Sequence, residues 1–557
     1  PGRELDGFTS ITVGNYGQRD IEAALTVPLA ETFSARAAIN TRNSTGWGET
    51  HDASDELVSK IGGVDESAGR LILRWQPSAA TDVQLNLSHA KTNDGRLPAR
   101  AIGAHPDGSD NAGWINLSSD IRVNYSSYKE IEKVTTKGAF LTIDQQLGPL
   151  SLTSISAFWD AQRFVTLDVD KSPVPSLRIS RNPTSKQYSQ ELRLASDDKT
   201  GFKWVAGALF FREPLAVQNY WSFGGTVAPN IPQSYHNVTK TKALFAEAIA
   251  DLNPTFSLTV GGRYSVDDND FDMDFAAVGI NNVERSRRDS NVSGRVILNQ
   301  RITDDASLYY SVSTGFQGGG YNGGAFGVAD IGNGYKPEKL TSYEIGWKSE
   351  LLARRLKFNG AAFYYDYRDI QLFSLASTST GGISQVITNA RKGRNYGVDI
   401  DVEALVTSAL TLSAGLGLLD SKYQDDTLGL LGFAGQSFSG NGNSFISAPS
   451  VDFKSSADYV LPVDKFRVRL HGDYSYRTKR AFDVTARPQV SGDAYGLLNC
   501  KLTAGPNGGN WEVSLWGKNL LDEKYVSFVA DLSGAVGLYE TFYGAPRQYG
   551  AQISVHY

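Results

Sequence analysis

Apolar and polar residues alternate one by one along much of this sequence, and this feature restricts the fold most strongly. In the last segment, Tyr549, Ile553 and Val555 fall on one face, whereas Gln552 and Ser554 fall on the other. A period of two places successive side chains on opposite faces of a β-strand. The pattern therefore predicts strands that have one apolar and one polar face.

We count about 22 such segments, an even number within the range of bacterial membrane barrels. Many reach about ten residues, longer than the five or six that are usual in globular strands. No stretch approaches the roughly 18 consecutive apolar residues that a membrane helix needs. The predicted strands lie near residues 7–16, 18–28, 32–43, 66–76, 81–91, 135–147, 150–170, 185–196, 202–213, 239–252, 256–268, 289–301, 305–315, 338–351, 355–372, 384–405, 410–420, 451–461, 466–476, 494–504, 511–520 and 546–557.

The connections between these segments alternate between short and long, with the first, at Gly17, as the exception. Outer-membrane barrels have short periplasmic turns and long external loops. In lipid an unpaired strand edge leaves backbone groups without partners, so the sheet must close on itself. The sequence therefore predicts an all-β, transmembrane, antiparallel up-and-down β-barrel of about 22 strands with a polar lumen. Its long extracellular loops are expected at 44–65, 92–134, 214–238, 269–288, 316–337, 421–450, 477–493 and 521–545.

The composition excludes several other classes of protein. The 56 glycines and the 11% of aromatic residues are typical of a barrel with aromatic girdles. A single cysteine rules out an intrachain disulfide framework and a cysteine-based metal cluster. The net charge of −6 offers no basic surface for nucleic acid, so we expect no nucleic-acid partner.

Several segments resemble motifs of the TonB-dependent outer-membrane receptor family, in the order in which that family has them. They are residues 315–322 (GFQGGGYN), 336–348 (KPEKLTSYEIGWK), 362–371 (AFYYDYRDIQ), 389–390 (NA), 397–399 (GVD), 518–525 (KNLLDEKY) and 546–550 (PRQYG). The aromatic Tyr557 also resembles the end of the family's assembly signal. The resemblance extends over the whole chain and is most specific in the second half. One departure is that position 399 carries Asp where Glu is common.

This resemblance implies a transporter of the bacterial outer membrane that actively takes up a scarce ligand, most commonly an iron-siderophore-type chelate. The family carries an N-terminal plug domain, and we expect residues 1–557 to be barrel alone, with the plug absent from this chain. The implied partners are the TonB complex of the inner membrane, acting through a plug, the chelate or other small-molecule substrate, and outer-membrane lipid with lipopolysaccharide. The alternative is a passive diffusion porin, although porins usually have 16–18 strands. We expect no enzymatic activity, no catalytic residue and no cofactor.

Aromatic side chains gather in the expected external loops, where they provide rigid contact area for a ligand. The set comprises Trp114, Tyr125, Tyr128, Tyr220, Trp221, Phe223, Tyr235, Tyr321, Phe326, Phe433, Phe438, Phe482, Tyr539 and Tyr543. From this set we single out seven ligand-binding candidates: Trp114, Tyr220, Trp221, Tyr321, Phe326, Tyr539 and Tyr543. For any one of them, packing within a loop or at the membrane interface is the alternative.

No metal site is predicted. The run Asp267, Asp268, Asp270, Asp272 and Asp274 lacks the glycine and the late bidentate Glu of a calcium-binding loop. We interpret it as a solvated external strand end, with a loosely bound divalent cation as the alternative. The six histidines contain no i, i+4 pair, so no zinc site is readable.

Overall fold

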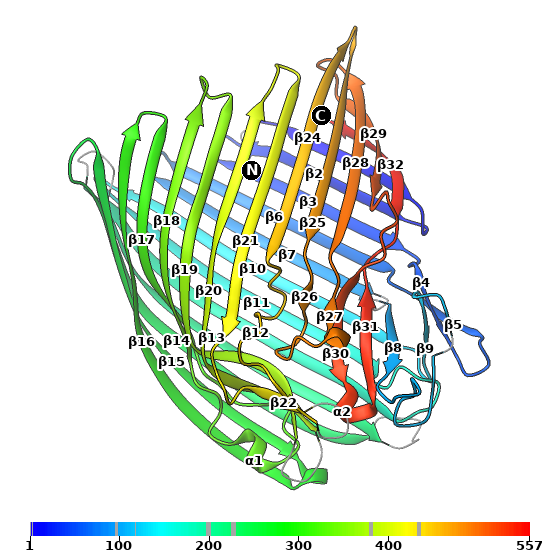
Figure 1. The fold of residues 1–557 in the computed structure, drawn as a ribbon. Coiled ribbons are helices and arrows are strands. Elements are labelled where there is room, and N and C mark those ends of the chain that lie inside the picture. Colours follow the sequence, from blue (N-terminus) through cyan, green and yellow to red (C-terminus); the bar gives the residue numbers. More distant parts are fainter. Residues whose placement is uncertain are drawn as a thin grey trace.

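A single sheet of 22 antiparallel strands closes on itself in the computed structural model, which describes residues 2, 4–94, 98–116, 118–196, 202–223, 230–377, 383–431 and 436–557. Each strand pairs with the barrel strand before it and the one after it (Figure 1). The barrel strands are β1 (Asp6–Gly14), β2 (Arg19–Ala30), β3 (Phe33–Ser44), β6 (Val64–Ser78), β7 (Thr81–Asp94), β10 (Ile131–Leu147), β11 (Leu150–Asp168), β12 (Leu177–Ser196), β13 (Phe202–Phe223), β14 (Ile231–Asp251), β15 (Phe256–Phe275), β16 (Ile280–Thr303), β17 (Ala306–Gln317), β18 (Glu338–Leu351), β19 (Leu356–Ser377), β20 (Ile383–Leu405), β21 (Leu410–Tyr423), β24 (Val451–Val463), β25 (Phe466–Arg477), β28 (Tyr495–Pro506), β29 (Trp511–Lys518) and β32 (Gln548–His556).

The first and last strands, β1 and β32, close the barrel by pairing in antiparallel register, with Ile11 opposite Ile553. Side chains add to the backbone ladder, because the hydroxyl oxygens of Ser10 and Ser554 are 2.9 Å apart. Tyr557 also exchanges backbone hydrogen bonds with Gly7. The described sheet therefore keeps no open edge, which is the condition that lipid imposes on a membrane-spanning sheet.

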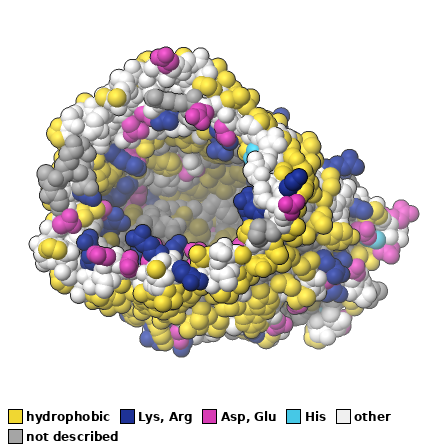
Figure 2. Space-filling model, turned by 90° about the horizontal axis from the view of Figure 1, so that it is seen from above, with side chains coloured by type: hydrophobic (Ala, Val, Ile, Leu, Met, Phe, Trp, Pro, Cys, Tyr) yellow, Lys and Arg dark blue, Asp and Glu magenta, His cyan; other side chains and the backbone are white. Residues whose placement is uncertain are grey.

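The two faces of the barrel wall differ as the alternation predicts. Large aliphatic side chains such as Leu244, Val292 and Leu515 are strongly exposed on the outer face, where lipid would cover them. Seen from the end where the short turns lie, the barrel is deeply hollowed, and acidic and basic side chains are frequent around the rim of the hollow (Figure 2). Among the described residues, no helix is both long and apolar enough to cross a membrane.

Each of the 22 predicted segments coincides with one barrel strand, and the predicted fold is confirmed. Two of the expected long loops, however, are wrong. Most of 214–238 belongs to β13 and β14, and most of 269–288 belongs to β15 and β16, which are joined by a short 3₁₀ turn, η1 (Ala276–Val278). The backbone ladder continues in these segments, and on β15 the alternation continues as well, with buried Phe271, Met273 and Phe275 between acidic residues. The sequence analysis interprets this stretch as a strand end because of its acidic residues and therefore ends the strand too early.

These long strands raise one side of the barrel into a tall wall. β13 has 22 residues and β16 has 24, whereas a strand needs about 9–11 residues to span a bilayer. In Figure 1 strands β13 to β16 reach far toward the end where the long connections lie, at the bottom of the picture. This wall forms one side of the barrel mouth at that end.

The long connections carry small sheets that the sequence analysis does not predict. These are β4 (Gly48–His51) with β5 (Leu57–Ile61) and β9 (Val123–Tyr125), β8 (Ala99–Gly103) with β31 (Leu538–Tyr543) and β30 (Val526–Leu532), β22 (Gly429–Leu431) with β23 (Ser437–Ser439), and β26 (Arg480–Ala481) with β27 (Ser491–Gly492). Short helical turns, α1 (Val328–Ile331), α2 (Ser533–Val536) and η3 (Pro488–Val490), complete the loops. The described parts of the long connections therefore form small sheets and turns at the mouth of the barrel.

Candidate ligand-binding site

The loops and the tall wall enclose a cavity of about 1040 Å³ at the long-loop end of the barrel, which we call the mouth cavity. This volume is at the upper end of the range for small-molecule sites. Its lining comes from the long-loop ends of β11, β12, β13, β14, β15 and β19, the β11–β12 connection, the η1 turn, and the loops that precede β10, β18, β28 and β32. Segments far apart in the sequence thus meet around one space.

One wall of the mouth cavity is aromatic. The rings of Trp221 and Phe223 stack with centroids 5.9 Å apart, and Phe326 packs edge-on against both of them. Phe275 in turn packs edge-on against Phe326 at 5.3 Å. The indole N–H of Trp221 donates to Gln233 at 3.0 Å, so the polar atom of this ring is satisfied within the wall. The rings therefore present a preformed apolar surface.

Further phenyl rings lie around the cavity. Phe482 is buried and packs edge-on against Phe528, with centroids 5.7 Å apart. Phe528 is 45% exposed, Phe223 is 45% exposed and Phe373 is 62% exposed, although all three line a cavity. Exposed phenyl rings in a concave site are suited to contact with flat or apolar parts of a ligand.

A buried lysine joins two loops beside this cavity. Lys171 is only 3% exposed and forms ion pairs with Glu130 and, at 3.3 Å, with Glu540. Glu540 lies on β31, whereas Lys171 lies in the β11–β12 connection. A charge this deeply buried needs partners of opposite charge. The two glutamates provide them and thereby tie the connection to β31.

Two aspartates, Asp168 at the end of β11 and Asp170 in the connection that follows, precede this lysine in the chain. Both lie far beyond the length of strand that a bilayer requires. Burial, followed by the negative charge of Asp170, raises the pKa of Asp168 to about 7. Asp168 accepts hydrogen bonds from the Ser126 hydroxyl and, at 2.9 Å, from the Ser127 backbone N–H. Burial also raises the pKa of Asp170, although backbone N–H groups of Ser176 and Leu177 donate to it. The proton occupancy of Asp168 therefore changes near neutral pH.

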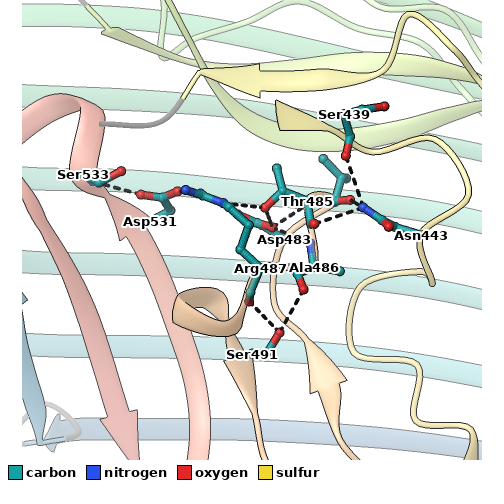
Figure 3. A network of polar contacts seen from close by, with 10 residues as sticks. Ser439, Asn443, Asp483, Thr485, Ala486, Arg487, Ser491, Asp531 and Ser533 are labelled. Carbon is teal, nitrogen blue, oxygen red and sulfur yellow. Dashed lines mark hydrogen bonds and ion pairs between the residues drawn. The ribbon is translucent and has the colours of Figure 1, made fainter. Parts of the chain in front are cut away.

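Polar contacts lock three loops together on the other side of the cavity (Figure 3). Arg487 lies between Asp483, at 3.6 Å, and Asp531, so one guanidinium serves two carboxylates. The side-chain amide of Asn443 donates to the backbone carbonyls of Val484 and Thr485 at 2.9 and 3.0 Å. The loops before β24, β28 and β32 are thus held in one arrangement, which fixes this part of the cavity wall.

The seven sequence-predicted aromatics divide into three groups. Trp221 and Phe326 line the mouth cavity. Tyr321 stacks on Phe271 in the hydrophobic cluster behind that wall, and Tyr220 is exposed on the opposite face of β13 from Trp221. The other three pack within the loop sheets, outside the lining: Trp114, Tyr539 and Tyr543. Contact of any of the seven with a ligand stays a prediction.

Of the wider aromatic set, Phe223 and Phe482 also line the cavity, whereas Phe433 lies outside the described residues. The sequence analysis missed Phe275, Phe373 and Phe528. Phe528 lies in an expected external loop and could have been included on the signal that selected the others. The same holds for Phe275, which lies in the expected loop 269–288. Phe373 lies one residue beyond a predicted strand, so only the folded arrangement shows that it lines the cavity.

The aspartate run on β15 forms cross-strand ion pairs, as its interpretation as a solvated strand end suggests. Asp268 pairs with Arg288, Asp270 with Lys240 at 3.0 Å, and Asp272 approaches the His236 ring at 2.8 Å. Within the described ranges, no group of three or more histidine, cysteine or acidic side chains is placed to hold a metal ion. The aspartates serve the strand pairing of the tall wall.

Residues 29–520 match a family model described as "TonB dependent receptor-like, beta-barrel". The chain belongs to the TonB-dependent receptor family. This receptor is 23% identical to the pesticin receptor of Yersinia enterocolitica over 261 residues, which are 46% of the chain and 37% of that relative. The match therefore spans little more than a third of the curated relative.

Solved structures share the barrel architecture of this receptor. The whole chain superposes on 80% of the ferric yersiniabactin uptake receptor FyuA from Yersinia pestis, with a TM-score of 0.82 and 18% identity. It also superposes on 82% of the siderophore receptor PiuA from Acinetobacter baumannii, with a TM-score of 0.78 and 14% identity. At these identities the likeness shows the fold alone.

Family membership locates the receptor in the bacterial outer membrane, with its short turns in the periplasm and its long loops outside the cell. The family consists of transport receptors and not of enzymes. The 22 strands exceed the 16–18 that are usual in porins, so a passive diffusion porin is not favoured. The mouth cavity therefore opens on the extracellular side.

Proposed function

We propose that this receptor captures a ferric siderophore-type chelate in the mouth cavity and that energy delivered by TonB drives uptake. The observation that carries the proposal is the mouth cavity itself, which lies on the extracellular side and is lined by preformed aromatic rings. Its volume of about 1040 Å³ suits a metal chelate of small organic ligands. The iron and siderophore cargo named for FyuA and PiuA supports the same class of ligand.

Capture and transport are separate steps in this proposal. The locked loops and the tall wall bind the chelate without large rearrangement, because their rings and polar groups are already packed. Passage through a barrel of this width requires a plug that fills the lumen and a source of energy that displaces it. We assign those parts to a plug domain and to the TonB complex of the inner membrane.

The experiment uses the full-length gene in a strain that lacks its own outer-membrane siderophore receptors. Uptake of ⁵⁵Fe from a panel of ferric chelates is measured in iron-limited cells with tonB intact and with tonB deleted. We expect at least one chelate to enter only when both the receptor and TonB are present. Iron uptake that is unchanged by deleting tonB, or receptor-dependent leakage of unrelated sugars of similar size, would instead support a diffusion pore.

A further inference from the structure

The charges around the mouth cavity are strongly unequal. Among the described residues that line it are six carboxylates but two cationic side chains, Lys171 and Arg181. Lys171 is held by Glu130 and Glu540, and the nearby Arg487 is held by Asp483 and Asp531. The positive charges of Lys171 and Arg487 are therefore already balanced by carboxylates of the receptor. Even when Asp168 is protonated, the other five lining carboxylates outnumber the cations Lys171, Arg181 and Arg487, so an anionic ligand would meet a wall whose overall charge is negative.

The carboxylates are also fixed in place by the loops that carry them. Asp170 accepts hydrogen bonds from two backbone N–H groups at 2.9 and 2.6 Å, and Asp531 accepts one from Ser533 at 2.9 Å. These hydrogen bonds hold Asp170 and Asp531 in place. Repulsion between like charges is also stronger in a partly dehydrated cavity than in water. The cavity is thus poorly suited to a ligand that carries several negative charges.

The apolar part of the lining indicates that the ligand carries aromatic groups. Phe223, Phe373 and Phe528 expose between 45% and 62% of their surface while they border the cavity. Stacking on such rings favours flat, π-bonded groups, and phenyl faces also attract positive charge. The excess of carboxylates and the exposed phenyl rings therefore both favour a neutral or cationic ligand with aromatic groups.

We propose that the mouth cavity selects chelates that are neutral or cationic and carry aromatic groups, and that it rejects trianionic complexes of the tris-catecholate type. This inference rests on the proposed function, because it assumes that the cargo is a metal chelate. It goes further in stating which chemical class of chelate the cavity accepts.

Three chromium(III) complexes, which exchange their ligands slowly, separate charge from aromaticity. Tris(benzohydroxamato)chromium(III) is neutral and aromatic, tris(acetohydroxamato)chromium(III) is neutral without rings, and tris(catecholato)chromate(III) is aromatic with three negative charges. Binding of each to the purified full-length receptor in detergent is measured by equilibrium dialysis, with bound chromium determined by atomic absorption. We expect the first complex to bind at least about tenfold more tightly than either of the other two.

Substitutions of the lining phenylalanines test whether they cause the selectivity between the three complexes. Phe223→Ala should weaken binding of the benzohydroxamate complex by about threefold to tenfold and leave the acetohydroxamate complex unchanged. Phe164→Ala is the matched control, because Phe164 is an exposed phenylalanine at the same end of the barrel that does not line the cavity. Phe373→Lys should improve binding of the catecholate complex at low salt relative to Phe373→Ala, since it adds a cation to the lining.

The inference is overturned if the catecholate complex binds as tightly as the benzohydroxamate complex, if the two hydroxamates bind equally, or if none of the three binds. These outcomes leave the proposed function open to its own test, because TonB-dependent iron uptake is scored in cells with a different panel. Loss of TonB-dependent uptake of every iron chelate, in contrast, removes the proposed function whatever the chromium complexes show.

Discussion

Replacing Lys171 with Met tests whether the buried lysine holds the extracellular loops together. Met has a similar length and fits an apolar environment, but it leaves Glu130 and Glu540 facing each other without the cation between them. Lys171 has a φ of 48°, and Lys and Met meet the same backbone constraint there. The substitution therefore removes the charge and adds no new backbone strain.

The expected size of the effect follows from burial. Lys171 is 3% exposed and its two partners are 10% and 12% exposed, so solvent hardly screens these ion pairs. Removing one partner of a buried ion pair costs about 3–5 kcal/mol. Since 1.36 kcal/mol corresponds to a factor of ten, local opening of the β11–β12 connection should increase by about 10²- to 10⁴-fold. The barrel strands, which close independently of this pair, should be unaffected.

Hydrogen exchange measured by mass spectrometry on the purified receptor resolves the effect by segment. Peptides from the β11–β12 connection and from β31 should exchange faster in the Lys171→Met protein, while peptides from the membrane-spanning strands stay protected. Lys240→Met is the matched control, because its ion pair with Asp270 is 40% and 54% exposed and is worth at most about 1 kcal/mol. If Lys171→Met opens the loops no more than Lys240→Met does, the assignment of Lys171 as a structural tie is wrong.

Two further predictions follow from single positions. Folding raises the pKa of Asp168 from its usual value of about 3.9 to about 7. The stability that this proton contributes is therefore complete below about pH 4 and is lost as the pH rises through 7. Protection of the β11–β12 connection from hydrogen exchange should therefore fall over that pH range, and Asp168→Asn should flatten this pH dependence. If the variant shows the same pH dependence, groups other than Asp168 cause it. Gly397→Ala places a Cβ 2.1 Å from the Leu418 carbonyl oxygen. This overpacking should lower the fraction of folded barrel by at least about half. The folded fraction is measured as the heat-modifiable band in gel electrophoresis. Gly262→Ala, which meets nothing within 4 Å, should fold normally, and equal yields of the two variants would contradict this packing argument.

The barrel strands could be predicted because lipid enforces their pattern. Residues such as Ile11 and Ile553 must be apolar where they face the bilayer, and their neighbours must be polar where they face the lumen. Above the membrane this constraint ends, and the sequence analysis places a loop at 214–238 where β13 and β14 in fact continue. The loop sheets are harder still, because β8 pairs with β31 through contacts such as Ile102 with Tyr539, more than 400 residues apart.

The candidate site was only partly accessible from the sequence for the same reason. Trp221 and Phe326 could be singled out because large aromatic residues in external loops are conspicuous by type alone. Lys171 offers no such signal, because its two glutamate partners lie on segments remote from it in the chain. The sequence shows which residue types occur in the loops, but the cavity is created by the way the loops meet.

The pairing of β1 with β32 also sets the order in which this receptor can be built. Strand β1 has both of its neighbours only when β32, more than 500 residues later, has been synthesised and exported. Contacts with such a large sequence separation form late and slowly. Until then two strand edges stay unpaired in the periplasm, where their free backbone N–H and C=O groups can pair with other chains. Closure of the newly exported barrel therefore depends on its final strand, and loss of β32 alone would leave unpaired edges on both β1 and β29.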